Sequence, residues 1–357
     1  MASKKVLVLG ARGMLGQELV RVFSLDERYA LLGWDREDID PAPIVHNSGS
    51  TPENSSEKSV VHNRCWVDVT DFTAAEKKIR EYAPEIILNC VAYNAVDACE
   101  ESDEEYQNAL LLNAEVPKFL ARVAKETGAV LVHYSTDYVF DGEKSEGYKE
   151  NDVPQPLSKY GMSKFTGEKA VIESFVIPVQ TGIQNSWIPS QARDDREENE
   201  NGGYYLIRLS KLFGQAAASA AAKKSFFEKM LEAADSTKLT AEKTKEVVQV
   251  VDDEKSCFTY APDLAVATKE LIESGDSFGT YHLVNTGGVT WYEAAKELYA
   301  QAHIGVTIQP VGSDVFLRKA LRPRCSTLLN TKRPLLRPYQ EALKEYLSEM
   351  QNEKIKV

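Results

Sequence analysis

The sequence contains few of the residues that build metal centres. It has five cysteines in 357 residues, with no C-x-x-C pair among them, and this usage suits a reducing cytosol. It also has only five histidines, and their positions show no ligand spacing. We therefore predict that the protein has no metal site.

Long apolar runs and an excess of positive charge are also missing. No apolar run approaches the roughly 20 residues of a membrane-spanning helix, and the first one, Val6–Leu9, is far too short for a signal peptide. The formal net charge of −12 argues against a broad surface for nucleic acid or anionic membrane, although it allows a local basic pocket for phosphates. We expect a cytoplasmic protein with no nucleic-acid partner and no membrane association.

Short apolar strand patterns alternate with helical patterns over the first two-thirds of the chain. The strand patterns show no polar alternation, which is typical of a parallel sheet covered by helices on both faces. We therefore predict an α/β fold with a doubly wound, parallel-sheet Rossmann domain. The predicted strands are Val6–Leu9, Ala30–Trp34, Ile86–Cys90, Val130–Tyr134 and Tyr204–Leu209, and the predicted helical segments are Met14–Phe23, Phe72–Tyr82, Asp103–Thr127 and Ser158–Phe175.

The alternation loosens after Gly214, which indicates a second unit. We expect the Rossmann domain at 1–214 and a smaller C-terminal α/β lobe at 215–357, from which a segment at about 250–275 returns to the Rossmann domain. Two stretches, about 41–64 and 177–203, are longer than ordinary connections and are interpreted as insertions. Neither carries a convincing reactive set, and their role stays open; Val176–Asp195 looks like a translated genomic repeat.

The turn after the first strand is rich in glycine and reads Gly10-Ala-Arg-Gly13-Met-Leu-Gly16. In a strand–turn–helix context, such glycines permit a tight turn and let the backbone approach a pyrophosphate at the helix N-terminus. We therefore predict a dinucleotide-binding turn, with contacts from Gly10, Arg12, Gly13, Met14, Leu15 and Gly16.

Charged residues near this turn leave the choice between NAD(H) and NADP(H) open. Asp35 ends the second strand, where a carboxylate binds the ribose hydroxyls of NAD. Arg36 follows it and Arg12 lies in the turn, and either arginine suits a 2′-phosphate. Asp68 and Val69, after the third strand, are predicted to border the adenine, although an aspartate in that place also serves as a helix cap.

Tyr160 and Lys164 stand four residues apart, which places both side chains on one face of a helix. An ammonium group near a phenol favours the phenolate, so we expect Lys164 to lower the pKa of Tyr160 and to make its proton mobile. The same spacing occurs at Tyr292 and Lys296. That second pair follows Thr290, a plausible helix N-cap, and is interpreted as part of an ordinary amphipathic helix.

Several motifs together resemble the extended short-chain dehydrogenase/reductase family. They are G-A-R-G-M-L-G, I-L-N-C-V-A-Y-N-A-V-D-A-C-E, L-L-N-A-E-V-P, H-Y-S-T-D-Y-V-F-D-G, Y-G-M-S-K-F-T-G-E-K and R-P-R-C-S-T-L-L-N, and they occur in this order over nearly the whole chain. Within the family, the match favours enzymes that reduce dTDP-linked 4-keto deoxysugars. The resemblance implies an NAD(P)-binding first domain, a second lobe that mainly binds a nucleotide sugar, and often a homodimer.

The resemblance also implies roles for individual residues. Thr136 and Tyr160 correspond to the groups that polarise and protonate the C4 oxygen of the sugar, and Lys164 corresponds to the residue that holds the nicotinamide ribose. The further residues matching cofactor contacts are Val91, Ala92, Tyr93 and Asn113. The residues matching substrate contacts are Asn94, Val96, Asp137, Lys211, Arg322 and Ser326.

The residue after Asp137 distinguishes two reaction types. Related nucleotide-sugar 4,6-dehydratases carry T-D-E, whereas this chain has Tyr138 in place of the glutamate, which favours simple carbonyl reduction. The substrate side departs from the family pattern, since Lys211 stands where a tryptophan is typical. Two alternatives therefore stay open: an epimerase or reductase for another nucleotide sugar, and a non-catalytic regulatory subunit resembling the beta subunit of methionine adenosyltransferase.

Overall fold

Apolar runs with little polar alternation form the central sheet of the protein. The computed structural model describes residues 2–35, 63–175, 202–218, 223–238 and 247–355, so most of the two interpreted insertions lie outside the described residues. Seven parallel strands run in the order β11-β6-β5-β4-β1-β2-β3. They are β1 (Lys4–Leu9), β2 (Tyr29–Asp35), β3 (Asn63–Trp66), β4 (Ile86–Asn89), β5 (Val130–Thr136), β6 (Gly203–Leu209) and β11 (Gly279–His282).

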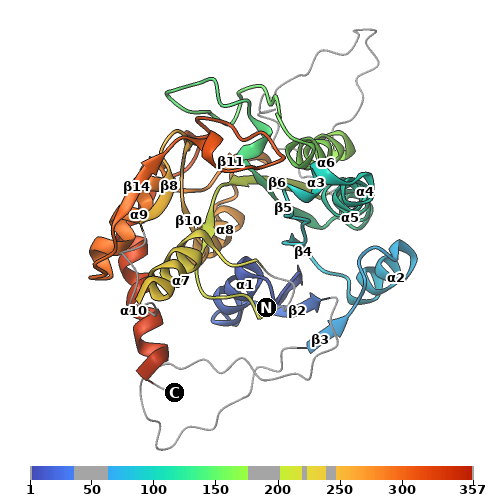
Figure 1. Ribbon diagram of the computed structural model, residues 1–357. Helices are drawn as coiled ribbons and strands as arrows, with labels where there is room; N and C mark the ends of the chain where they lie inside the picture. The colour runs from blue at the N-terminus through green and yellow to red at the C-terminus, as the bar shows by residue number, and fades with distance from the viewer. Residues whose placement is uncertain (1, 36–62, 176–201, 219–222, 239–246, 356–357) are drawn as a thin grey trace, which may run out of the picture.

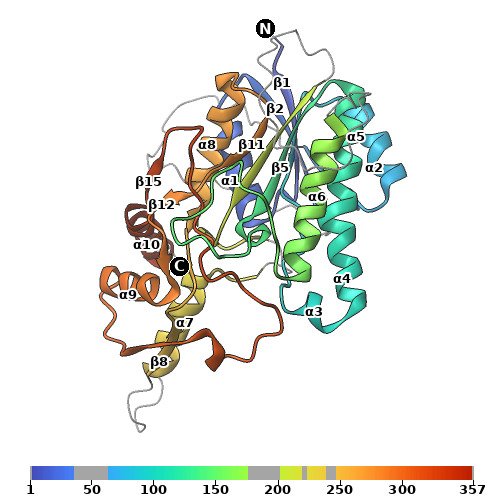
Figure 2. The ribbon, with the colours of Figure 1, turned by 90° about the horizontal axis from the view of Figure 1, so that it is seen from above.

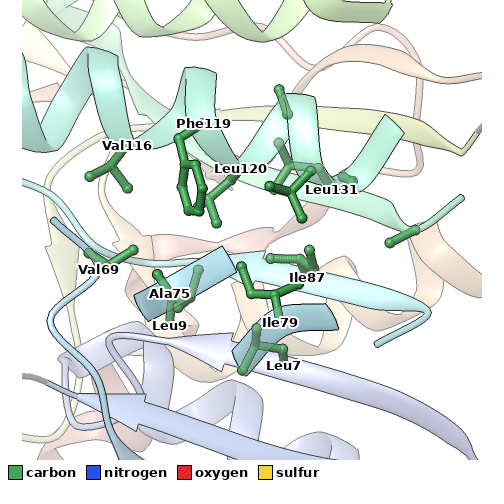
Figure 3. Packing of buried hydrophobic residues seen from close by; sticks show 14 of the residues in the cluster. Leu7, Leu9, Val69, Ala75, Ile79, Ile87, Val116, Phe119, Leu120 and Leu131 are labelled. Atoms are coloured by element: carbon green, nitrogen blue, oxygen red, sulfur yellow. The ribbon is translucent and has the colours of Figure 1, made fainter. Parts of the chain in front are cut away.

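Helices cover both faces of this sheet, which confirms the predicted doubly wound fold (Figures 1 and 2). One face packs against α1 (Met14–Ser24) and α8 (Ala261–Ser274), and the other against α2 (Phe72–Tyr82), α5 (Val116–Thr127) and α6 (Lys159–Phe175). Figure 3 shows Phe119 and Leu120 of α5 facing the strand residues Ile87 and Leu131. Because both faces are buried, the strands read as continuous apolar runs.

The segment predicted as one or two helices at Asp103–Thr127 contains a π-helical turn. After α3 (Ala98–Glu101), helix α4 (Asp103–Leu110) passes through the turn η1 (Leu111–Glu115) into α5. Gly167 of α6 packs directly on this turn, since a Cβ at Gly167 would lie 2.0 Å from the carbonyl oxygen of Asn113. The π turn and this glycine together bring α6 close to the polypeptide that follows β4.

The later part of the chain builds a second, aromatic-rich core beside the sheet. It contains α7 (Phe226–Lys238), α9 (Trp291–Gln301), α10 (Tyr339–Ile355) and the parallel pair β8 (Val248–Val251) and β14 (Ile308–Val311). Thr290 begins α9 with a capping box to Glu293, as predicted for the helix that carries Tyr292 and Lys296. The remaining short elements are β7 (Leu212–Phe213), β9 (Lys255–Ser256), β10 (Thr259–Tyr260), β12 (Asn285–Thr286), β13 (Val289–Thr290), β15 (Leu336–Pro338), η2 (Asp137–Val139) and η3 (Ser313–Val315).

A buried ion pair joins α6 to the sheet. Arg208 of β6 donates from Nε and Nη2 to the two carboxylate oxygens of Glu168, at 2.9 and 2.7 Å, and from Nη1 to the carbonyl of Glu150 at 3.2 Å. The Arg208 side chain is 2% exposed and that of Glu168 is fully buried. Such a pair contributes to stability only when its geometry is good and its remaining groups are hydrogen-bonded, and both conditions hold here.

We predict that Glu168→Gln lowers the free energy of unfolding by about 3–5 kcal/mol, because it leaves the Arg208 cation buried and uncompensated. Urea unfolding measures the change. Glu126→Gln is the matched control, since Glu126 pairs with Arg80 and Arg122 on the surface, and it should cost about 0–1 kcal/mol. Equal effects of the two substitutions would contradict a dominant role for the buried pair.

Candidate active site

The glycine turn after β1 has the geometry that a pyrophosphate requires. Gly10 has a φ of +72°, which side chains rarely adopt, and a Cβ at Gly16 would lie 2.0 Å from the carbonyl oxygen of Gly10. Gly13 is the N-cap of α1 and supplies no side-chain cap. The first N–H groups of the helix are therefore open to a ligand, and the helix dipole favours an anion there.

Asp35 and Arg12 lie together at the edge of this turn. The Arg12 backbone N–H donates to Oδ2 of Asp35 at 2.9 Å, which places the carboxylate at the end of β2 beside the turn. The Arg12 guanidinium donates from Nη2 to the carbonyl of Ala218 at 2.7 Å, and its buried Nη1 has no partner among the described residues. Arg36, the other predicted phosphate ligand, lies outside the described residues.

The loop after β4 is fixed against α6 by Asn113. The Asn113 side chain accepts from the Tyr93 N–H at 2.9 Å and donates to the Tyr93 carbonyl at 3.0 Å, and it also donates to Oγ of Ser163 at 2.9 Å. Ser163 in turn donates to the carbonyl of Tyr160 at 2.8 Å. Asn113 is fully buried, so the structure shows it as the link between the predicted cofactor loop and the helix that carries Tyr160.

Some of the other predicted cofactor residues lie in loops that follow strands, and others lie in or beside the two cores that flank the sheet. Val91 and Ala92 follow β4, and the Val91 N–H donates to the Asn89 side chain at 3.2 Å. Asp68 accepts from both the N–H and the hydroxyl of Thr70, in the turn before α2. Leu15 and Val69 are buried in the two cores that flank the sheet, whereas Met14, at the start of α1, is only partly buried.

Thr136, Tyr160 and Lys164 meet at the carboxyl end of β5. Thr136 is the last residue of β5, and its hydroxyl interacts with that of Tyr160. The Tyr160 hydroxyl also donates to Oδ1 of Asn94 at 3.3 Å, and its ring packs edge-to-face on Tyr138. Lys164, which is 2% exposed, donates from Nζ to the carbonyl of Tyr134 at 2.7 Å.

The expected lowering of the Tyr160 pKa by Lys164 is not found in the structure. Burial raises the pKa of Tyr160 above its usual range, and the group that opposes this rise is the Thr136 hydroxyl rather than Lys164. Burial also lowers the pKa of Lys164 to about 8. The reason is desolvation, which disfavours the charged form of both groups. Tyr160 therefore holds its proton at neutral pH, as a proton donor must.

The loop between η3 and β15, called the C-terminal loop below, carries Arg322 and Ser326 and contacts other predicted substrate residues. Ser326 donates to Oδ2 of Asp137 at 2.5 Å, and Thr136 donates to Oδ1 of the same carboxylate at 3.1 Å. Arg322 forms a bidentate pair with Asp97, with distances of 3.1 and 2.7 Å. Asp137 thus joins Ser326 to Thr136, whereas Arg322 is joined to Asp97, in the segment that carries Asn94 and Val96.

Lys211 has neighbours that the sequence did not indicate. Its Nζ lies 3.8 Å from the ring centroid of Trp291, the first residue of α9. The Trp291 indole N–H donates to Oε2 of Glu254 at 3.0 Å, and Arg318 Nη1 donates to the same oxygen at 3.1 Å. In the sequence, Trp291 was recognisable only as the residue after the Thr290 cap. That position predicts the start of a helix, but it does not predict that the tryptophan lies near the site.

Fold and site together define an NAD(P)-dependent oxidoreductase of the extended short-chain type. The family described as "RmlD substrate binding domain" matches residues 4–194 and 195–352. The chain belongs to this family. Within the described ranges, no three or more His, Cys, Asp or Glu side chains are grouped so as to hold a metal ion, and no helix has the length and apolarity to cross a bilayer.

Known proteins resemble the chain over most of its length. It is 31% identical to a dTDP-4-dehydrorhamnose reductase of Streptomyces griseus, over 90% of this chain and 84% of that protein. It is 29% identical to a dTDP-4-keto-6-deoxy-D-glucose reductase of Streptomyces niveus, over 90% and 87% of the two chains. The crystal structure of dTDP-4-dehydrorhamnose reductase from Bacillus anthracis in complex with NADP superimposes with a TM-score of 0.73 at 27% identity, and the match covers 97% of this chain and 99% of that one.

We predict that Gly16→Ala abolishes tight binding of NADPH, because the added Cβ has to displace the Gly10 carbonyl and the start of α1. Nicotinamide fluorescence measures the dissociation constant, and thermal unfolding shows whether the variant folds. Gly305→Ala is the matched control, since a Cβ there meets nothing within 4 Å and should leave binding unchanged. A folded Gly16→Ala variant that binds NADPH normally would refute the assigned role of the turn.

Proposed function

We propose that the protein reduces the C4 keto group of a dTDP-linked deoxysugar with NAD(P)H, converting dTDP-4-dehydro-L-rhamnose to dTDP-L-rhamnose. The observation that carries the proposal is the convergence of Thr136, Tyr160 and Lys164 at the carboxyl end of β5, at the same edge of the sheet as the glycine turn after β1. In a doubly wound sheet, ligands bind outside the carboxyl ends of the strands where the strand order reverses. Here β1 and β4 flank that point.

Each residue of the site has a chemical task in this proposal. NAD(P)H, when bound, supplies the hydride for C4. The open N–H groups at the start of α1 bind its pyrophosphate, and Lys164 orients its nicotinamide ribose. Thr136 and Tyr160 donate hydrogen bonds to the C4 oxygen, and Tyr160 transfers its proton as negative charge develops there. Asn113 acts through Tyr93 and Ser163 as a positioning residue.

The proposal extends to the organisation of the protein. We propose that 1–214 mainly bind the cofactor and 215–357 mainly bind the sugar, because the second core contributes Trp291 and the C-terminal loop contributes Ser326 to the substrate side. The family resemblance further supports a homodimer in the cytoplasm. Light scattering of the purified protein measures its oligomeric state.

One alternative function differs from this one in what it requires of Tyr160, and the other differs in its substrate. A non-catalytic regulatory subunit needs no buried tyrosine with a raised pKa beside a threonine hydroxyl, and an enzyme for another sugar needs the same tyrosine with a different substrate. Oxidation of NADPH and NADH with dTDP-4-dehydro-L-rhamnose separates the three readings. Absence of turnover by the wild-type protein would exclude the proposed reaction.

We predict that Tyr160→Phe lowers kcat by about 10²–10⁴-fold, because the variant keeps the ring but loses the transferable proton. Nicotinamide absorbance measures the rate, and NADPH binding should persist. Tyr292→Phe is the matched control, since Tyr292 has the same spacing to a lysine but lies on α9 in the second core. Turnover that survives Tyr160→Phe unchanged would remove Tyr160 from the mechanism.

We predict that kcat/KM falls about tenfold per pH unit above pH 8, as the buried Lys164, whose pKa is lowered to about 8, loses its charge. Loss of the Lys164 proton should by itself add to the unfolding free energy between about pH 8 and 10.5, because this lysine binds fewer protons in the folded than in the unfolded state there. The difference in unfolding free energy between wild type and Lys164→Met measures this contribution. A fall in activity that follows the loss of folded protein would instead indicate alkaline unfolding. Lys211 also has a pKa lowered to about 8. Lys211→Met is therefore the control, and the fall in kcat/KM above pH 8 should persist in this variant if Lys164 causes it.

A further inference from the structure

Lys211 carries a charge that its surroundings leave without a hydrogen-bond acceptor. Across the described residues, the Lys211 ammonium makes no hydrogen bond and no ion pair; it lies over the rings of Trp291, at 3.8 Å from the centroid, and Phe258, at 5.5 Å. An ammonium group has three N–H donors, and an aromatic face satisfies its charge but accepts no conventional hydrogen bond. Lys211 is only partly buried, and the described residues supply its ammonium with no acceptor, so this position favours a ligand that does.

The backbone at Lys211 indicates that the side chain is held there for a purpose. Lys211 has a φ of +40°, a conformation that favours glycine or asparagine, at the point where the chain leaves β6 for β7. Strain of this kind costs on the order of 1–3 kcal/mol and persists where the surroundings enforce it, often at ligand sites. A glycine would relieve the strain but would remove the cation from the site.

Lys211 lies at the same end of the sheet as Thr136, since it comes two residues after Leu209, the register partner of Thr136. Asp137 and Glu254 are the carboxylates that act on Lys211, and Asp137 accepts from the catalytic Thr136 at 3.1 Å. Glu254 is already paired with Arg318, and Asp97 with Arg322. Lys211 and Asp137 therefore balance one another, which favours a neutral hydroxyl over an anionic group as the ligand, because a further anion would meet Asp137.

We infer that Lys211 is a specificity-determining residue whose ammonium donates a hydrogen bond to the sugar hydroxyl vicinal to the C4 carbonyl, the hydroxyl on C3. This inference rests on the proposed function. The Trp291 ring holds the Lys211 side chain in place, and Thr136 fixes the C4 oxygen on the neighbouring side. A site built to bind a hydroxyl discriminates against the analogue that lacks it, because its donor then loses its acceptor. The enzyme should accordingly require a 3-hydroxy sugar.

The test compares dTDP-4-dehydro-L-rhamnose with its 3-deoxy and 2-deoxy analogues. For wild type, we expect kcat/KM to fall by at least about tenfold with the 3-deoxy analogue, the loss that one charge-assisted hydrogen bond predicts, and much less with the 2-deoxy analogue. Lys211→Met keeps a chain of similar length on the Trp291 ring but has no donor. In this variant the ratio between the parent sugar and its 3-deoxy analogue should collapse toward one, and Lys211→Arg should restore part of it.

Four outcomes of the experiment would contradict the inference or the function on which it rests. A wild-type enzyme that uses the parent and 3-deoxy sugars equally well overturns the inference, and so does a Lys211→Met variant that loses activity toward both in the same proportion. If Lys211→Met changes the kcat/KM ratio between the parent sugar and its 2-deoxy analogue but not the ratio between the parent sugar and its 3-deoxy analogue, the assignment to C3 is overturned. No turnover of any sugar by the wild type, with NADPH binding intact, instead contradicts the proposed function. Thermal unfolding of each variant establishes that it is folded.

Discussion

The buried pair between Arg208 and Glu168 is the constraint on which the geometry of the site depends. Glu168 lies one helical turn after Lys164 on α6, and Arg208 lies on β6, the strand next to the one that ends in Thr136. Neither charge is tolerable alone in this interior, so α6 has one axial position at which both are satisfied. That position sets the height of Tyr160 and Lys164 above the strand ends.

Much of the fold and of the cofactor end was predictable from the sequence, because their signals are local. A continuous apolar run such as Val6–Leu9 identifies a buried parallel strand, and glycines after it identify the dinucleotide turn. The helix over Phe72–Tyr82 has the predicted bounds. By contrast, the π turn at Leu111–Glu115 has no sequence signal, because it follows from the fit between Asn113 and Gly167 of another helix.

The substrate side was less predictable for a physical reason. Lys211 lies over the ring of Trp291, and Glu254 accepts from both Trp291 and Arg318. These contacts join segments that are distant in the chain, so no sequence spacing predicts them. The pKa of Tyr160 was also hard to predict, because it depends on burial by distant parts of the chain. A spacing of four residues predicts that an ammonium lies near the phenol, but the depth of both groups decides which effect is larger.

The place of Lys211 at the end of β6 has a consequence for the divergence of such enzymes. Up to Leu209 the strand belongs to the sheet that supports the cofactor turn, and from Leu212 the chain belongs to β7, which pairs with β10 instead. Under the proposed function, a single replacement at the junction would change what faces the sugar without moving Tyr160 or the glycine turn. Descendants of one ancestor can therefore acquire new sugars while inheriting the reductive machinery intact.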